Sequence, residues 1–232
     1  MAGRPAHLEQ LPLPIPNTWG GKRKGAGRKR VPNRRSSVPH RTRPVHRAAH
    51  PVHVTLRART GLPPLRDRAI FTQMKAAIRE ASRSPAVGSS FRVVQFSVQN
   101  DHLHLIVEAS DADHLGRGVQ GLAIRLARVI NRVLVGSGKV WGERYHARPL
   151  RTPREVRNAI VYVLMNAKKH LRRASRDGVD PMSSAPWFDG FRGAGGRALA
   201  AVIDAPVVAS RTWLGATGWR RHGLVRVDDA PA

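Results

Sequence analysis

The sequence predicts an α+β fold, in which helices lie on an antiparallel, ferredoxin-like sheet. Between residues 51 and 170 the patterned segments follow the order strand, helix, strand, strand, helix, strand, helix, which is typical of that fold. Residues 1–50 have no hydrophobic periodicity, so burial cannot offset the entropy of ordering them. We therefore expect a disordered basic tail at 1–50, a globular domain at 51–170 and a partly ordered C-terminal extension at 171–232.

Composition narrows the class of protein. The chain has 232 residues, of which 41% are hydrophobic, and it contains no cysteine. The hydrophobic content is enough for one substantial core. The absence of cysteine excludes disulfides, thiolate zinc sites and cysteine nucleophiles. No early apolar run resembles a signal peptide, and no stretch approaches the roughly 20 apolar residues of a membrane span. We expect a soluble cytoplasmic protein with no membrane partner.

The charge balance is strongly basic. Lysine and arginine number 41 against 15 acidic residues, for a net charge of +26. Such a charge destabilises a compact fold unless a polyanion neutralises it, and arginine suits bidentate contacts to phosphate. An arginine-rich proteome would explain arginine in place of lysine, but it does not explain the shortage of acids. We expect a nucleic-acid partner and a nucleoid-associated location.

The tail carries much of this charge. Residues 1–50 hold twelve lysines and arginines against one acid, Glu9. A glycine-flanked basic cluster can lie along phosphates or enter a minor groove, loosely as an AT-hook does, and a nonspecific electrostatic arm is the favoured interpretation. The candidate DNA contacts in the tail are Lys22, Arg23, Lys24, Arg28, Lys29 and Arg30.

The first half of the domain contains a predicted hairpin. Residues 52–57 alternate as a strand, and residues 65–82 place apolar side chains at helical spacing. The β-rich segment 91–99 is followed by the turn residues Asn100 and Asp101 and then by the strand-like run 102–109, which is typical of a hairpin.

The second half contains two further helices. Residues 115–134 form an apolar stripe that ends at Gly136, and 140–150 read as a short returning strand. Thr152, Pro153 and Glu155 then form a capping box that starts a helix running toward His170. Beyond it, residues 211–225 interleave tryptophan with arginine. This pattern fits tryptophans docked on the domain, which we favour, or stacking on single-stranded nucleic acid.

Four residues suggest chemistry. His102 and His104 share one face of their strand, which we expect to be open, and Leu103 lies on the opposite, apolar face. Imidazole is the commonest side-chain metal ligand near neutral pH. Tyr162 and Asn166 share one face of the last helix. An amide oxygen beside two imidazoles suits Mg²⁺ or Mn²⁺. With its hydroxyl pKa near 10, tyrosine is a poor nucleophile unless positive charge or a divalent cation assists it.

Together these motifs resemble a known family. The run HLHLIVEA, a long helix, WGERYHARPL and a helix with Tyr-x-x-x-Asn resemble, over about residues 50–170, the single-tyrosine transposases of the His-hydrophobe-His (HUH) nuclease class, in particular the REP-associated tyrosine transposases. The resemblance implies that 51–170 is a catalytic domain in which His102, His104 and Asn166 hold Mg²⁺ or Mn²⁺. It further implies that Tyr162 cleaves and rejoins single-stranded DNA at hairpins through a 5′-phosphotyrosine, leaving a free 3′-hydroxyl.

Some features depart from that family or remain open. Family members often have Asn-Pro where this chain has Asn166-Ala167, so the helix is expected to continue. Arg144 and His146 are candidate DNA contacts.

Two alternative functions are open. A replication initiator or relaxase shares the catalytic pair but usually carries further domains, and a domesticated, non-catalytic DNA-binding protein of the same fold is the main alternative. The resemblance leaves open whether the chain forms a homodimer and whether the tyrosine acts in its own subunit.

Overall fold

The computed structural model describes residues 45–83, 90–171, 179–193 and 204–229, with side chains to Asn166 in the second range. It confirms the predicted α+β class and the order of elements in the domain. These elements are β1 (Val52–Arg57), α1 (Arg68–Arg83), β2 (Phe91–Val98), β3 (His102–Ala109), α3 (Ala112–Val133), β4 (His146–Pro149) and α4 (Pro153–Leu171).

The four strands form one antiparallel sheet in the order β2-β3-β1-β4, which is the ferredoxin-like arrangement. Thr55 of β1 lies opposite His104 of β3 on one side and opposite His146 of β4 on the other. Ser97 of β2 lies opposite His104. Because residues directly opposite each other share a face, these four polar side chains form a row across the whole sheet.

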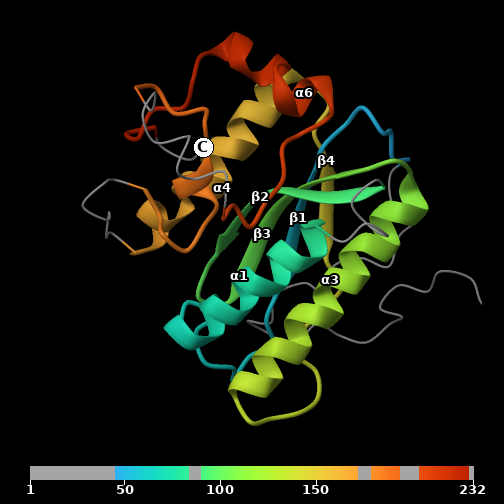
Figure 1. Cartoon of the computed structure of the whole chain (residues 1–232), viewed down its shortest axis with the longest axis vertical. Coiled ribbons are helices and arrows are strands. Elements are labelled where there is room, and N and C mark those ends of the chain that lie inside the picture. The colour runs from blue at the N-terminus through green and yellow to red at the C-terminus, as the bar shows by residue number, and fades with distance from the viewer. Residues whose placement is uncertain (1–44, 84–89, 172–178, 194–203, 230–232) are drawn as a thin grey trace, which may run out of the picture. The chain divides into compact units, whose positions relative to one another are not determined.

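The two faces of the sheet are covered by different elements. Helices α1 and α3 lie side by side on one face (Figure 1), over a core that includes Val54 and Leu105. Helix α4 and the C-terminal segments pack on the other face, in a second core that includes Ile106 and Trp219. Both faces of β3 are therefore buried beyond its first residue.

This second layer corrects one expectation. The alternating pattern suggested that the face bearing His102 and His104 is open, yet His104 is only 4% exposed. The reason is that α4 and the extension cover this face. The extension has no periodicity from which its docking could be predicted.

Specific contacts explain three of the element boundaries. The amide of Glu155 donates to Thr152 Oγ1 over 3.2 Å and the amide of Thr152 donates to Glu155 Oε2 over 3.2 Å, so the capping box is confirmed and α4 runs past Asn166 as expected. Helix α1 starts three residues later than predicted because the Asp67 carboxylate accepts from the amides of residues 69 and 70. Strand β4 is shorter than the predicted 140–150, since Trp141 makes only an isolated bridge to Ala58.

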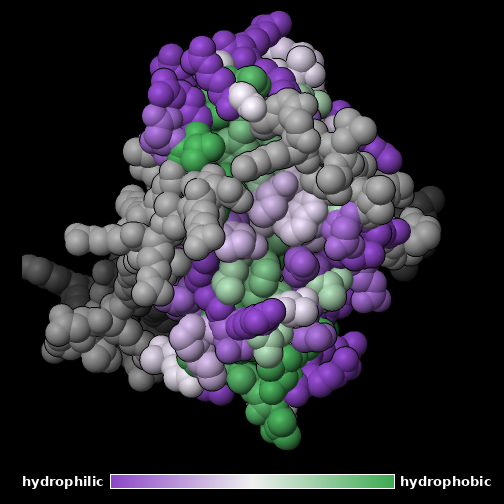
Figure 2. All heavy atoms as spheres, turned by 60° about the vertical axis from the view of Figure 1, so that its left-hand side comes forward, coloured by the Kyte–Doolittle hydropathy of each residue, from purple (hydrophilic) through white to green (hydrophobic). Residues whose placement is uncertain are grey.

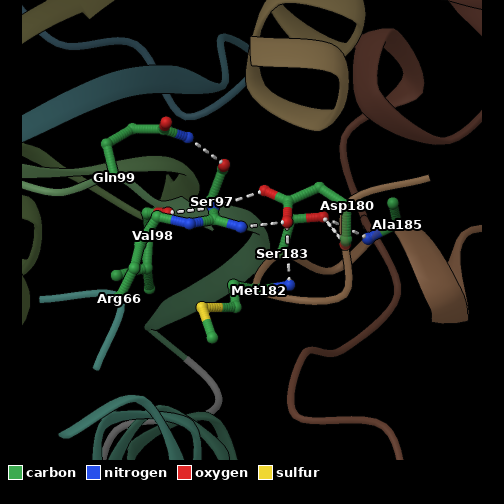
Figure 3. Close-up of polar contacts among 8 residues, drawn as sticks. All are labelled: Arg66, Ser97, Val98, Gln99, Asp180, Met182, Ser183 and Ala185. Atoms are coloured by element: carbon green, nitrogen blue, oxygen red, sulfur yellow. Dashed lines mark hydrogen bonds and ion pairs between the residues drawn. The ribbon is translucent and has the colours of Figure 1, made fainter. Parts of the chain in front are cut away.

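Two buried carboxylates attach the extension to the domain. Asp180 receives two hydrogen bonds from Arg66, of 2.7 and 2.8 Å, and Arg66 also donates to the carbonyl of Val98 over 2.7 Å (Figure 3). Glu108 of β3 accepts from the amides of Arg211, over 2.8 Å, and Thr212, over 3.1 Å. The extension's short helical elements are η1 (Ala185–Trp187), α6 (Trp213–Ala216) and η2 (Gly218–His222).

Helix α4 is tied to the end of the extension by Arg157. Its guanidinium donates to the carbonyls of Gly223, over 3.0 Å, and Leu224, over 3.3 Å, and pairs with Asp229 at 2.8 Å. The extension is therefore bonded to Arg66, which precedes α1, to β3 and to α4.

Part of the predicted tail is ordered. Residues 47–50 form a turn closed by a 2.9 Å bond from the His50 amide to the Arg47 carbonyl, and His46 Nε2 lies 2.8 Å from the carbonyl oxygen of Ala109. The candidate tail contacts from Lys22 to Arg30 lie outside the described residues.

In the described part of the chain, no helix combines the length and apolar character needed to cross a membrane.

Removing the buried carboxylate of Asp180 should destabilise the fold strongly. Asp180→Ala leaves the Arg66 guanidinium, whose side chain is 14% exposed, without its partner, and we expect a loss of about 3 kcal/mol in the free energy of unfolding. Arg226 and Asp228 form a matched control pair, because their geometry is also bidentate, at 2.8 and 2.9 Å, but both are exposed. Asp228→Ala should change stability far less in the same denaturant titration; equal losses would contradict this account.

Candidate active site

Two strands and one helix converge on a group of aromatic side chains. The ring of His104 lies 4.6 Å from that of His102, 5.2 Å from that of His53 and 5.0 Å from that of Tyr162, measured between centroids. Three of these four residues were predicted from the sequence. The structure therefore brings the predicted nucleophile into contact with His104, which in turn contacts the other predicted histidine, His102.

His102 is oriented by a carboxylate. Its Nδ1 lies 2.6 Å from Asp101 Oδ1, and Asp101 in turn pairs with Arg57 at 3.1 Å. Burial raises the pKa of Asp101, but the hydrogen bond and charge of His102 and the charge of Arg57 outweigh it, so the pKa lies below its usual value. A carboxylate on one ring nitrogen orients a histidine to bind metal through the other, which here is Nε2.

His104 is oriented by the neighbouring strand. Its Nδ1 lies 3.1 Å from Thr55 Oγ1 and 3.2 Å from His53 Nε2. These contacts fix the ring of His104, and a metal would be held by its Nε2.

His53 is a site residue that the sequence analysis missed. Burial, with the positive charges of His146 and Arg148 added to it, lowers its pKa from 6.5 to about 4. It is therefore neutral near pH 7 and can hydrogen-bond His104 without adding charge. The alternation of VHVTLR places His53 and Thr55 on one face, but only the register between β1 and β3 shows that this face meets His104.

Tyr162 is held by ring contacts in the middle of α4. It is half-buried, and its ring meets those of His104 and His53 edge to face, the latter at 5.6 Å between centroids. An aromatic ring packed in this way has a defined direction. The phenol oxygen is therefore carried by a rigid element at the edge of the histidine group.

Asn166 lies one turn further along the same face of α4 and is fully buried. Neither atom of its amide group has a hydrogen-bond partner among the described residues. Leaving a buried polar group unsatisfied costs about 1–3 kcal/mol, so such an amide fits a ligand position.

These residues fit a hard divalent cation. Two imidazoles and an amide oxygen form a mixed set that suits Mg²⁺ or Mn²⁺. Over residues 45–229, excluding the undescribed segments, no group of three or more histidine, cysteine or acidic side chains is arranged to hold a metal. A metal here would depend on the mixed set.

The structure separates the two other candidate DNA contacts. His146 is exposed on β4, opposite Thr55, and so shares the face of the aromatic group. Arg144 instead lines a hollow beside Leu56, Leu115 and Trp141. Leu56 points to the opposite face of the sheet, so Arg144 lies away from Tyr162.

Comparison with known proteins identifies the fold. No protein-family model and no curated protein sequence matches the chain. Among solved structures it resembles a REP-associated tyrosine transposase bound to a REP hairpin, with 16% sequence identity and a TM-score of 0.50, over 64% of this chain and 83% of that one. The chain therefore has the fold of a REP-associated tyrosine transposase.

We expect an NMR titration to find that His53 protonates near pH 4 in the folded protein. The pKa of His53 in the folded protein lies below its unfolded value of about 6.5. The contribution of neutral His53 to the free energy of unfolding is therefore complete above pH 6.5 and is lost as the pH falls toward 4. His53→Phe should remove that part of the acid sensitivity in thermal unfolding, whereas His222→Phe, at an exposed position, should not. A pKa near 6.5 for His53 would contradict its burial.

Proposed function

We propose that the protein is a metal-dependent, single-strand-specific DNA transesterase related to transposases, with Tyr162 as nucleophile. The observation that carries this proposal is the contact between the rings of Tyr162 and His104, 5.0 Å apart, one turn from a buried amide without a partner. An ordinary core tyrosine would not need two histidines and a buried amide beside it.

The proposed reaction exchanges one phosphate ester for another. The phenol oxygen of Tyr162 attacks the phosphorus and forms a bond to the 5′-phosphate, while the bond to the 3′-oxygen breaks. The phenol gives up a proton and the 3′-oxygen takes one, so protons balance. Attack by a 3′-hydroxyl on the phosphotyrosine reverses the step and rejoins DNA.

The protein's own residues position this chemistry. His102, His104 and Asn166 are the proposed ligands, and a divalent cation held there would stabilise charge developing on the phosphate. Asp101, Thr55 and His53 orient the two ligand histidines through the contacts described above.

DNA is the proposed partner because of charge and fold. The net charge of +26 favours a polyanion, and the solved transposase of the same fold is bound to a REP hairpin. His146, on the face of the nucleophile, and the basic tail residues from Lys22 to Arg30 are the proposed phosphate contacts. Arg144 is a proposed contact for a part of the DNA away from Tyr162. Homodimer formation and a nucleoid-associated location remain predictions.

The second candidate is a non-catalytic DNA-binding protein of the same fold. The net charge favours it equally, but the four site residues argue against it, since a site under no chemical demand would not be expected to keep all four. Covalent adduct formation separates the two functions.

Tyr162→Phe should abolish the covalent adduct with a labelled DNA hairpin that carries a single-stranded flank, on a denaturing gel with Mn²⁺. The loss should be on the order of 10⁴-fold or more, as for removal of other catalytic nucleophiles, while hairpin affinity stays nearly unchanged because the ring remains. The chain has only one other tyrosine, Tyr145, so Tyr145→Phe is the matched control and should keep the adduct. An adduct that persists without Tyr162 would identify another nucleophile, and no adduct in the unaltered protein would favour the non-catalytic alternative.

The metal assignment predicts weaker Mn²⁺ binding in calorimetry for His102→Ala and His104→Phe, by roughly tenfold or more. Phenylalanine is used at position 104 because that side chain is buried and a truncation would leave a cavity. Asn166→Ala should have a smaller effect, since water can replace one oxygen ligand. His146→Ala, on the same face but outside the ligand set, should bind normally; unchanged affinity in both ligand-histidine variants would overturn the assignment.

A further inference from the structure

The extension holds its two closely spaced tryptophans differently. Trp219 is 1% exposed and packs against Phe188, with ring centroids 5.6 Å apart. Trp213, at the start of α6, is 50% exposed. Packing against the domain thus explains the presence of Trp219 but not that of Trp213.

The exposed position of Trp213 is built into the local structure. The buried Glu108 carboxylate binds the amides of Arg211 and Thr212, which lead directly into α6. Leu214, the next residue, takes the buried position of this short helix. A Cβ at Gly218 would lie 2.8 Å from the Trp213 ring, so the ring rests against the backbone of Gly218.

Positive charge surrounds the ring. Arg221 places its guanidinium carbon 4.8 Å from the centre of the Trp213 ring, and residues 210–222 contain three arginines and no acid. Arg220 is paired with Asp189 at 2.9 Å, whereas no carboxylate of the described residues pairs with Arg221 or Arg211. Figure 2 shows mainly hydrophilic residues, with paler and hydrophobic ones among them, at the upper end, where Figure 1 places α6.

We propose that Trp213 and Arg221 form a stacking site for an unpaired base of single-stranded DNA. A flat base can take the place of the guanidinium on the ring, since both stack on aromatic faces, and Arg221 and Arg211 are then free to pair with phosphates. An exposed aromatic ring among unpaired arginines fits a nucleic acid strand, which offers a planar group and a negative charge at every step. This site rests on the proposed function, because it would hold the strand that Tyr162 cleaves.

The strand that carries His104, β3, also anchors the segment that leads into the stacking site. Glu108 and His104 lie on one face of β3, four residues apart, which is about 13 Å along a strand. The same face is covered by α4 with Tyr162 and by the extension. DNA reaching Tyr162 can therefore continue onto the extension without crossing the sheet.

Tryptophan fluorescence tests the site directly. A short oligothymidylate is added to the full-length protein in a chelator, so that cleavage does not enter the measurement. Stacking on Trp213 should quench emission, and Trp213→Phe should remove that quenching. Trp187→Phe is the matched control, because Trp187 also lies under a cation, Lys75, at 5.5 Å; it should keep the quenching.

Affinity gives the second readout. Trp213→Ala should weaken oligothymidylate binding by about tenfold and binding of blunt duplex by much less. Arg221→Gln should weaken the binding of single strands more than Arg128→Gln, which removes an exposed charge from α3 on the other side of the sheet. Thermal unfolding verifies that each variant is folded. If Trp213→Ala does not fold, the fluorescence quenching of Trp213→Phe tests the stacking site in its place.

Quenching that survives in Trp213→Phe, or equal losses for single strands and duplex, would overturn the stacking site. Failure of Tyr162 to form an adduct would not change these binding results. Loss of the stacking site would likewise leave the adduct assay intact. The two proposals therefore fail separately.

Discussion

The pairing of β1 with β3 is the constraint on which the site depends. It places Thr55 opposite His104 and so brings His53, two residues earlier on β1, against the same ring. Because side chains alternate along a strand, a slip of one residue would send all of them to the opposite face. The apolar residues next to them in the chain, Val54 and Leu105, are paired with each other and fully buried under α1 and α3. The hydrophobic core itself therefore holds the register that assembles the polar face.

Much of the fold could be predicted because its signals are local. The hairpin, the long helix α3 and the capping box of α4 depend on residues within a few positions of one another, and all three are observed. Three predicted residues, His102, His104 and Tyr162, also meet, since the strand and the helix that carry them were correctly recognised. For Asn166 the structure shows burial on the same helix face as Tyr162.

The features of the fold and site that the sequence did not predict depend on contacts between distant segments. His53 joins the site through a cross-strand register, which no local pattern reveals. The face of the sheet that carries His104 is covered in part by the extension, whose docking rests on single polar residues such as Asp180 and Glu108 instead of on periodicity. The start of α1 at Arg68 was missed because one carboxylate, that of Asp67, outweighs the helical spacing of an earlier leucine.

Arg157 has a consequence for how two copies of the chain could cooperate. It bonds α4 to the carbonyls of Gly223 and Leu224 and to Asp229. The helix that carries Tyr162 is therefore fixed to residues 223–229 of the extension. An exchange of α4 between two molecules would have to take the extension along or break those bonds. The described contacts thus hold Tyr162 beside the histidines of its own chain, and the C-terminal segment contributes to keeping it there.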